Sequence, residues 1–100
     1  MVKHIVFWKL KENAAGQSAK ENAEQIKQKL EALNNKIPGT IKIEVGINFL
    51  SSDSNFDVAL YSEFESKEAL ELYQEHPLHQ AILPFVRAVV TDRKAVDYEI

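Results

Sequence analysis

Apolar and polar residues alternate with the two-residue period of a β-strand in several segments of the chain. The alternation is clearest over 41–49, where one face is formed by Ile41, Ile43, Val45, Ile47 and Phe49. Residues 2–10 and 56–64 have the same period and are rich in β-branched and aromatic side chains. The connection at 51–55 contains turn-forming serine, aspartate and asparagine. Because this connection is short, 41–49 and 56–64 are predicted to pair as antiparallel neighbours.

A helical pattern separates the first strand from the second. Over 18–36 the apolar residues recur at intervals of four and three, and they form one stripe: Ala19, Ala23, Ile26, Leu30, Leu33 and Ile37. Pro38 and Gly39 end the pattern. Because the pattern lasts for fewer than three heptads, it predicts a surface helix of a globular domain rather than a coiled coil.

A second helical pattern follows the third strand and is interrupted by prolines. Ser66 is of the residue type that caps a helix N-terminus. Pro77 disfavours helix at the residue before it, so the first part of this segment is predicted to end near His76. Pro77 is itself favourable in the first turn of a new helix, and Pro84 is predicted to kink or split that helix.

A turn at 91–93 and a last strand over 94–100 complete the order β-α-β-β-α-β, with the second helix broken. This order predicts an α+β ferredoxin-like fold, in which helices cover one face of a four-stranded antiparallel sheet. The other face has no helix to cover it and carries the semi-apolar set Ile5, Phe7, Ala59, Tyr61, Val96 and Tyr98. Such a face predicts a partner, most simply a second copy that packs sheet to sheet as a homodimer.

Composition limits the classes of function. With 100 residues, of which 45% are hydrophobic, the chain is predicted to be one globular domain over 1–100. Its net charge is −3 without a basic patch, so no nucleic-acid partner is expected. Cysteine is absent, which excludes thiolate catalysis, and there is no glycine-rich phosphate loop. Neither a signal-peptide pattern nor an apolar run of about 20 residues is present, so we expect no membrane partner and a cytoplasmic location.

Candidate chemistry depends on three histidines and one carboxylate. His4 lies within the apolar first strand, and His76 and His79 bracket the helix break at Pro77. Asp97 lies in the last strand. A histidine that a carboxylate orients can act as a general base near neutral pH, and the same pair can also be a purely structural hydrogen bond. Because Pro77 interrupts the turn between His76 and His79, no metal site is expected.

Six segments, in order and with the expected spacing, resemble the stress-responsive dimeric α/β-barrel domain family. They are Val2-Lys3-His4-Ile5-Val6, Ile37-Pro38-Gly39, Glu44-Val45-Gly46-Ile47-Asn48, Asp57-Val58-Ala59-Leu60-Tyr61-Ser62-Glu63-Phe64, His76-Pro77-Leu78-His79 and Val96-Asp97-Tyr98-Glu99. Together they span essentially the whole chain. The resemblance implies a ferredoxin-like fold in which two copies pack their sheets into a barrel. It implies no single activity, because most members of the family have no assigned biochemical function.

The resemblance also extends to a plant polyketide cyclase of this family, which closes a linear polyketide by an aldol step without a cofactor. By this resemblance His79 is the catalytic base, Asp97 orients it and Tyr73 supports it. A pocket histidine of the cyclase matches His4. Another pocket histidine of the cyclase is replaced here by Val58, which leaves the substrate open.

Three interpretations of the function follow. In the first, each subunit binds a small apolar or aromatic ligand between sheet and helices, beside His4, Val58 and Trp8, and performs cofactor-free acid/base chemistry. Trp8 shares its strand face with His4, so it is expected either in the core or at the cavity wall. In the second, the chain is a non-catalytic, stress-associated dimer with buried structural histidines. The third draws on the wider barrel superfamily, which also contains cofactor-free monooxygenases and haem-binding proteins.

Overall fold

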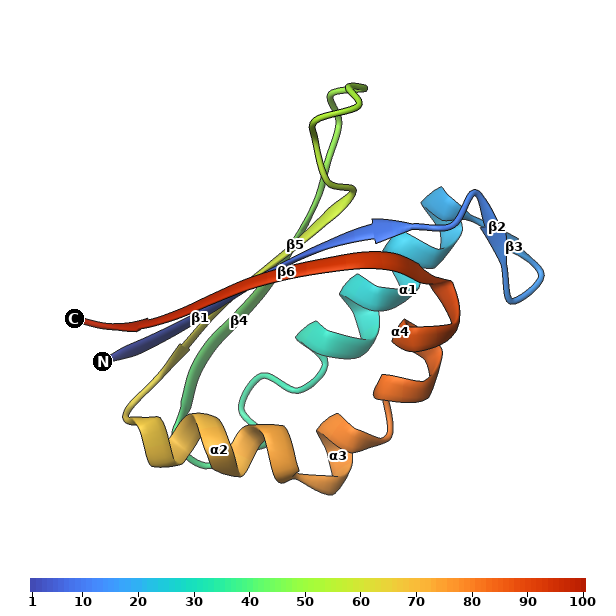
Figure 1. The fold of residues 1–100 in the computed structure, drawn as a ribbon. Coiled ribbons are helices and arrows are strands. Elements are labelled where there is room, and N and C mark those ends of the chain that lie inside the picture. The colour runs from blue at the N-terminus through green and yellow to red at the C-terminus, as the bar shows by residue number, and fades with distance from the viewer.

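The alternating segments form one four-stranded antiparallel sheet in the computed structural model, which describes residues 1–100 (Figure 1). The strands lie in the spatial order β4 (Thr40–Ile47), β5 (Val58–Phe64), β1 (Val2–Leu10) and β6 (Val90–Glu99). β1 pairs with both β5 and β6, so the first and last strands of the chain are neighbours. The predicted ferredoxin-like fold is therefore confirmed.

The helices cover one face of the sheet and leave the other face bare (Figure 1). They are α1 (Ala19–Glu31), α2 (Lys67–Glu75), α3 (Pro77–Gln80) and α4 (Leu83–Val89). The predicted break in the second helical segment is confirmed, because His76 is extended, Pro77 opens α3 and Pro84 lies in the first turn of α4. None of these helices is long and apolar enough to cross a membrane.

Side-chain caps determine where α1 and α2 begin. The hydroxyl of Ser18 accepts a hydrogen bond from the backbone N–H of Glu21, and the Glu21 carboxylate accepts one from the backbone N–H of Ser18. This reciprocal pair is a capping box, which satisfies two N–H groups that a helix start leaves free. Ser66 accepts from the backbone N–H of Ala69, so its predicted role as N-cap is confirmed.

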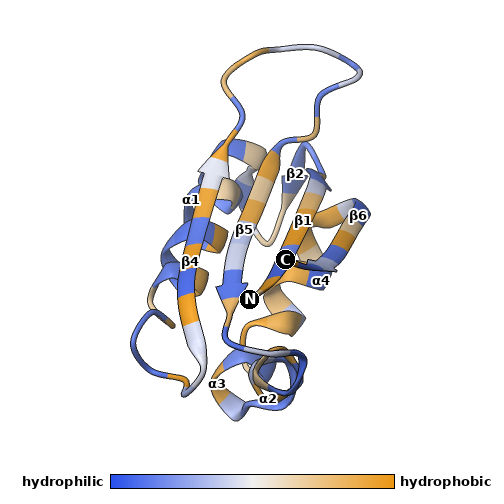
Figure 2. Cartoon of the chain, turned by 90° about the vertical axis from the view of Figure 1, so that its left-hand side faces the viewer, coloured by the Kyte–Doolittle hydropathy of each residue, from blue (hydrophilic) through white to orange (hydrophobic).

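The core lies between the covered face of the sheet and the helices. Apolar residues alternate with polar ones along the strands (Figure 2), and those buried on the covered face are Val2, Val6, Trp8, Ile43, Val45, Val58, Leu60 and Phe64. Gly39 allows α2 to close over this core. It has a positive φ of 82°, and a Cβ added there would lie 2.6 Å from the Cβ of Ala69. Only glycine meets both conditions.

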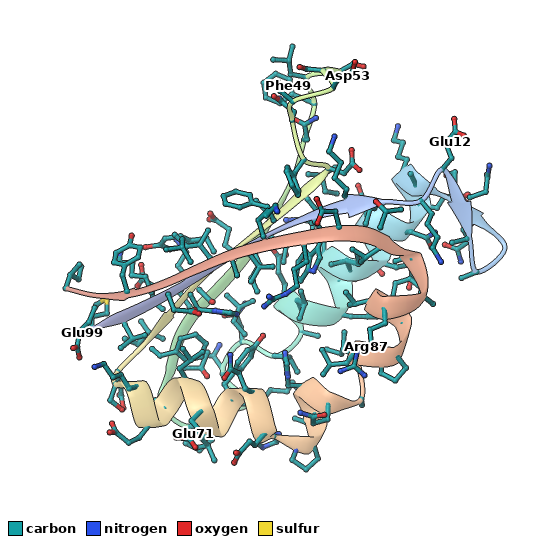
Figure 3. The ribbon with its side chains drawn as sticks, viewed as in Figure 1. Glu12, Phe49, Asp53, Glu71, Arg87 and Glu99 are labelled. Atoms are coloured by element: carbon teal, nitrogen blue, oxygen red, sulfur yellow. The ribbon has the colours of Figure 1, made fainter.

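Three segments of the four-stranded sheet differ from the sequence prediction. A bulge early in β4 shifts its register, so Ile41 turns outward and is 47% exposed. β4 ends at Ile47, and Phe49 is therefore 98% exposed near the outer tip of the loop between β4 and β5 (Figure 3). Residues 91–93 continue β6 rather than forming a turn, because they pair with the end of β1.

A short hairpin that the sequence did not predict precedes α1. Its strands are β2 (Asn13–Ala14) and β3 (Gln17–Ser18), and it pairs in antiparallel register. Ala15 and Gly16 at its tip both have positive φ, 52° and 74°, as type I′ turns require. α1 itself ends at Glu31, five residues before the predicted end at 36.

Polar side chains from α1 and the turn after it cover the outer edge of β4. Asn34 exchanges two hydrogen bonds with the backbone of Ile43, at 2.8 and 2.9 Å. The Glu31 carboxylate accepts from the N–H of Val45 at 2.9 Å, and Lys27 donates to the C=O of Val45 at 2.6 Å. These bonds satisfy backbone groups that an edge strand leaves unpaired, and they hold α1 firmly against the sheet.

Candidate functional site

A cavity of about 470 Å³ lies between the sheet and the helices. Most of its wall is apolar and is formed by Val6, Trp8, Leu30, Leu60, Ile82, Leu83 and Val86. A smaller polar set faces the same space: His4, Gln74, His79, Gln80, Arg87 and Arg93. An apolar cavity of this size with a few polar groups has the character of a small-molecule site.

His4, in the cavity wall, forms an imidazole–carboxylate pair with Asp97, which lies outside the cavity wall. They lie directly opposite each other on β1 and β6, and Oδ1 of Asp97 accepts a hydrogen bond from Nδ1 of His4. His4 is buried, and its backbone C=O accepts a hydrogen bond of 2.7 Å from the Ser62 hydroxyl. Because an ionised carboxylate only accepts, the Nδ1 proton stays on His4 and Nε2 is the ring nitrogen left for a ligand.

His79, at the α3 side of the cavity, is oriented by a different acceptor. Its Nδ1 lies 3.2 Å from the backbone C=O of Gln74, and its ring centroid lies 4.5 Å from that of Tyr73. Burial is the main cause that lowers the pKa of His79 below its ordinary value of 6.5. The hydrogen bond with Gln74 opposes this shift, and the nearby His4 adds to it. The structure thus differs from the predicted His79–Asp97 pair, because the β1–β6 register brings Asp97 to His4 instead.

Tyr73 lies behind His79 rather than among the residues that line the cavity. It is fully buried, and its ring also packs against Phe64, with 5.0 Å between the centroids. Its hydroxyl has no hydrogen-bond partner, and burial raises its pKa, so the hydroxyl stays protonated at neutral pH. Tyr73 therefore supports the His79 ring from behind. Contact between Tyr73 and a ligand stays a prediction.

The two remaining predicted ligand-binding residues lie in different places. Trp8 lines the cavity beside the apolar wall. Val58 is buried opposite Trp8 in the β1–β5 ladder but is not at the cavity, contrary to the expectation. It lines instead an open hollow near the loop between β4 and β5, together with Phe7 and Phe56. Val58 is paired with the far end of β1, four residues beyond His4, which accounts for its distance from the imidazoles.

The third histidine has a structural role. Nδ1 of His76 accepts a hydrogen bond of 3.1 Å from the backbone N–H of Leu78 and so caps α3. It therefore occupies the break between α2 and α3 and not the cavity wall. The structure brings together no group of three histidine, aspartate or glutamate side chains that is placed to hold a metal ion.

Sequence reasoning missed two arginines at the cavity. Arg87 lies in the last turn of α4 (Figure 3), and Arg93 lies on β6 opposite Trp8. Both residues are exposed, so they lie at the mouth of the cavity rather than in its interior. They are the only arginines of the chain, and this rarity is the one feature of the sequence that could have drawn attention to them.

Two charges on the bare face of the sheet, Lys3 and Glu63, are paired. Lys3 donates to the hydroxyl of Tyr61 at 2.5 Å and lies 3.4 Å from Glu63, and the Tyr61 hydroxyl donates to Glu63. The hydrogen bond with Tyr61 is the main cause that raises the pKa of Lys3 and lowers the pKa of Glu63. Exposed apolar side chains on the same face include Phe7, Val96 and Tyr98.

Comparison with known proteins identifies related chains. The model of the family described as Stress responsive A/B Barrel Domain matches residues 2–100. A dimeric protein of unknown function and ferredoxin-like fold from Bacteroides fragilis is 35% identical, with a TM-score of 0.82, over 99% of this chain and 95% of that chain. A dimeric ferredoxin-like protein of unknown function from Thermobifida fusca is 23% identical, with a TM-score of 0.84, over 99% and 90% of the two chains.

A structure of known activity is also similar in fold. The hydroxynitrile lyase from Passiflora edulis is 23% identical, with a TM-score of 0.77, over 99% of this chain and 92% of the lyase. No curated protein matches the chain. At this level of identity, the likeness to the lyase concerns the fold alone.

Proposed function

We propose that this chain, which belongs to the stress responsive A/B barrel domain family, is a homodimer that binds a small apolar or aromatic ligand and moves a proton on it without a cofactor. The observation that carries the proposal is the presence of two imidazoles, His4 and His79, in one apolar cavity. Each has its Nδ1 against an acceptor, so each keeps Nε2 for a ligand.

His4 is the base that this arrangement favours. The Asp97 carboxylate holds the ring in one tautomer and stabilises the imidazolium that forms when Nε2 takes a proton. His79 is neutral at pH 7, because burial lowers its pKa, and its Nε2 accepts a second proton or a hydrogen bond from the ligand. Tyr73 is a positioning residue that supports the His79 ring.

The reaction class that fits such a site is proton abstraction beside a carbonyl group. The C–H bond breaks, the proton goes to an imidazole nitrogen, and the electron pair moves into the enolate. An aldol-type ring closure, an isomerisation or a decarboxylation can follow, and none of these needs an oxidant or a reductant. The hydroxynitrile lyase from Passiflora edulis has a similar fold, so this fold is able to carry an enzyme active site.

The bare face supports the homodimer. Lys3 and Glu63 on this face already have hydrogen-bond partners, so a second sheet can cover these two charges without leaving either of them unpaired. Phe7 is 39% exposed at the middle of this face, and packing against a second copy removes that area from water. The similar structures from Bacteroides fragilis and Thermobifida fusca are described as dimeric.

Exchange of the benzylic protons of phenylacetone for deuterium tests the proposed proton transfer. The probe is small and aromatic and carries an acidic C–H bond beside a carbonyl group. We expect the protein to accelerate this exchange, followed by NMR in D2O, and Asp97→Asn to lower the rate by about tenfold or more. His76→Asn is the matched control, because His76 lies outside the cavity and asparagine also caps helices.

The same NMR spectra report binding directly. Phenylacetone is expected to shift the ring signals of His4 and His79 and to leave those of His76 unchanged. If the protein neither accelerates exchange nor shows these shifts, the second interpretation, a non-catalytic dimer with structural histidines, replaces the proposal.

A further inference from the structure

We propose that the ligand of this cavity carries a single carboxylate, which Arg87 and Arg93 hold at the mouth while the apolar part lies inside. The inference depends on the proposed function, because it names the class of molecule that the cavity accepts. It assigns the two arginines a role in ligand selection rather than in proton transfer.

The distribution of cations over the chain is the first observation. The sequence has two arginines and ten lysines. Both arginines line the cavity, and no lysine does. Arginine presents a planar, five-donor fork that matches the two oxygens of a carboxylate, whereas lysine presents a flexible point charge. The guanidinium groups at the mouth of the cavity are therefore suited to bind a planar anion such as a carboxylate.

The second observation is that these two guanidinium groups have no partner in the chain. Neither makes a side-chain hydrogen bond or an ion pair, and no aspartate or glutamate lines the cavity. Four of the ten lysines are paired with carboxylates, as in Lys3–Glu63 and Lys42–Glu44. Unpaired cations beside an apolar space are the arrangement that an anionic ligand completes.

The two arginines reach the mouth from separate elements. Arg87 comes from the last turn of α4 (Figure 3), and Arg93 comes from β6, where it lies opposite Trp8. Both also border a shallow hollow just outside the cavity, beside Trp8. A carboxylate at this opening is thus reached from the helix layer and from the sheet.

Charge at the mouth favours a monoanion over a dianion. Asp92 borders the same outer hollow, and its carboxylate accepts a hydrogen bond of 2.8 Å from the backbone N–H of Arg93. With this carboxylate, the two arginines leave one net positive charge at the opening. One carboxylate balances that charge, whereas a phosphate monoester at neutral pH brings nearly two negative charges.

The shape of the cavity selects the rest of the molecule. Its interior is apolar and contains two imidazoles, of which His79 is neutral at pH 7 because burial lowers its pKa. A second carboxylate deep inside therefore finds no fixed cation. The ligand class is an aryl-alkyl or medium-chain monocarboxylic acid, with the reacting carbonyl group placed near the imidazoles and the acid near the mouth.

The only tryptophan of the chain, Trp8, lines the cavity and provides the readout. Tryptophan fluorescence is titrated with 4-phenylbutanoate and with 4-phenylbutanamide, which differ only in charge at the end that should face the arginines. We expect the acid to bind about tenfold or more tightly than the amide in the wild-type protein. This comparison needs no variant.

Substitutions of the two arginines then test whether these residues cause the preference for the acid over the amide. Arg87→Gln and Arg93→Gln are each expected to reduce the preference for the acid, and the double variant is expected to abolish it. Arg93→Lys keeps the charge but loses the fork, so it should retain only part of the preference. Lys20→Gln removes one positive charge from an exposed position on α1, away from the cavity, and should change nothing.

The outcomes separate this inference from the function on which it depends. Equal affinity for acid and amide overturns the carboxylate inference but leaves an apolar ligand site in place. Tighter binding of octyl phosphate than of octanoate also overturns it, in favour of a dianion. If neither acid nor amide changes Trp8 fluorescence or shifts the histidine signals, both the inference and the proposed function fail.

Discussion

The two faces of the sheet consist of alternate residues of the same strands, yet they hold polar groups in opposite ways. On the bare face, Lys3, Tyr61 and Glu63 form a closed set in which both charged groups have partners. On the covered face, the guanidinium of Arg93 lacks a partner within the chain, as does that of Arg87 on the helix layer. Satisfied polar groups suit a flat surface that another sheet can cover, whereas unsatisfied ones suit a cavity that a ligand completes.

The largest expected effect distinguishes packing on the two faces. Phe64→Ala on the covered face should lower the free energy of unfolding by about 3–5 kcal/mol, because Phe64 is fully buried between the sheet and Tyr73. Phe7→Ala on the bare face should change the stability of the isolated chain by only about 0.5 kcal/mol or less. Urea unfolding at low protein concentration measures both variants.

These two variants also provide a check on the assignment of the faces. Equal losses for Phe64→Ala and Phe7→Ala would mean that the bare face is as well packed as the core, against its 39% exposed Phe7. Phe64→Leu is a milder change for the case in which the alanine variant fails to fold.

The second effect concerns association rather than folding. Phe7→Asp places an unpaired carboxylate at the centre of the proposed sheet-to-sheet interface, so the dissociation constant of the dimer should rise by about a hundredfold. Sedimentation over a range of concentrations measures this shift. Glu12→Gln, on the exposed segment after β1, is a charge-changing control that should leave the dimer intact. A Phe7→Asp protein that stays dimeric at low concentration would place the interface elsewhere.

The sequence predicted the strands and the helix break well, because each depends on neighbours in the chain. Alternation over 2–10 and 56–64 has a period that only strands match, and Pro77 forbids a continuous helix by sterics alone. Ile41 shows the limit of this reasoning. A bulge in β4 depends on the partner strand, so no pattern within 41–49 reveals that Ile41 turns outward.

The site was predicted only in part, because it depends on strand register and on helix orientation. Alternation places His4 and Asp97 on the same face of the sheet, but it does not tell which residue of β1 lies opposite Asp97. The observed register pairs Asp97 with His4, and the orientation of α3 gives His79 to the carbonyl of Gln74. His4 and His79 therefore share one cavity, but Asp97 orients His4 rather than His79.

The third effect concerns how α2 closes the covered face. Gly39→Ala requires a non-glycine residue at a φ of 82° and brings its Cβ within 2.6 Å of the Cβ of Ala69. Strain and overpacking together should cost about 1–3 kcal/mol of unfolding free energy, measured by urea unfolding. Gly16→Ala is the matched control, since its φ is also positive, 74°, but nothing lies near the added Cβ. A loss at Gly39 no larger than at Gly16 would mean that contact with Ala69 contributes nothing.

The smallest expected effect is the pH dependence of stability, which differs between His79 on the covered side and Glu63 on the bare face. Burial lowers the pKa of His79, so below its ordinary value of 6.5 the unfolded chain takes up a proton that the folded chain refuses. Stability should therefore fall slightly as pH decreases from about 6.5, until the lowered pKa of folded His79 is reached. Glu63 acts in a lower window, because its hydrogen bond with Tyr61 lowers its pKa. Its contribution is present above its ordinary value of 4.5 and is lost as pH falls below that value.

Two variants isolate these windows in urea unfolding from about pH 7 to about pH 3. In a plot of unfolding free energy against pH, the upper slope lies just below pH 6.5 and the lower slope just below pH 4.5. His79→Gln should flatten only the upper slope, and Glu63→Gln only the lower slope, because each variant removes one of the two titrating groups. His76→Asn should leave the upper slope unchanged, since His76 lies at the helix break outside the cavity. If the upper slope persists in His79→Gln, another titrating group causes it, and the acid sensitivity does not come from the burial of His79 in the cavity.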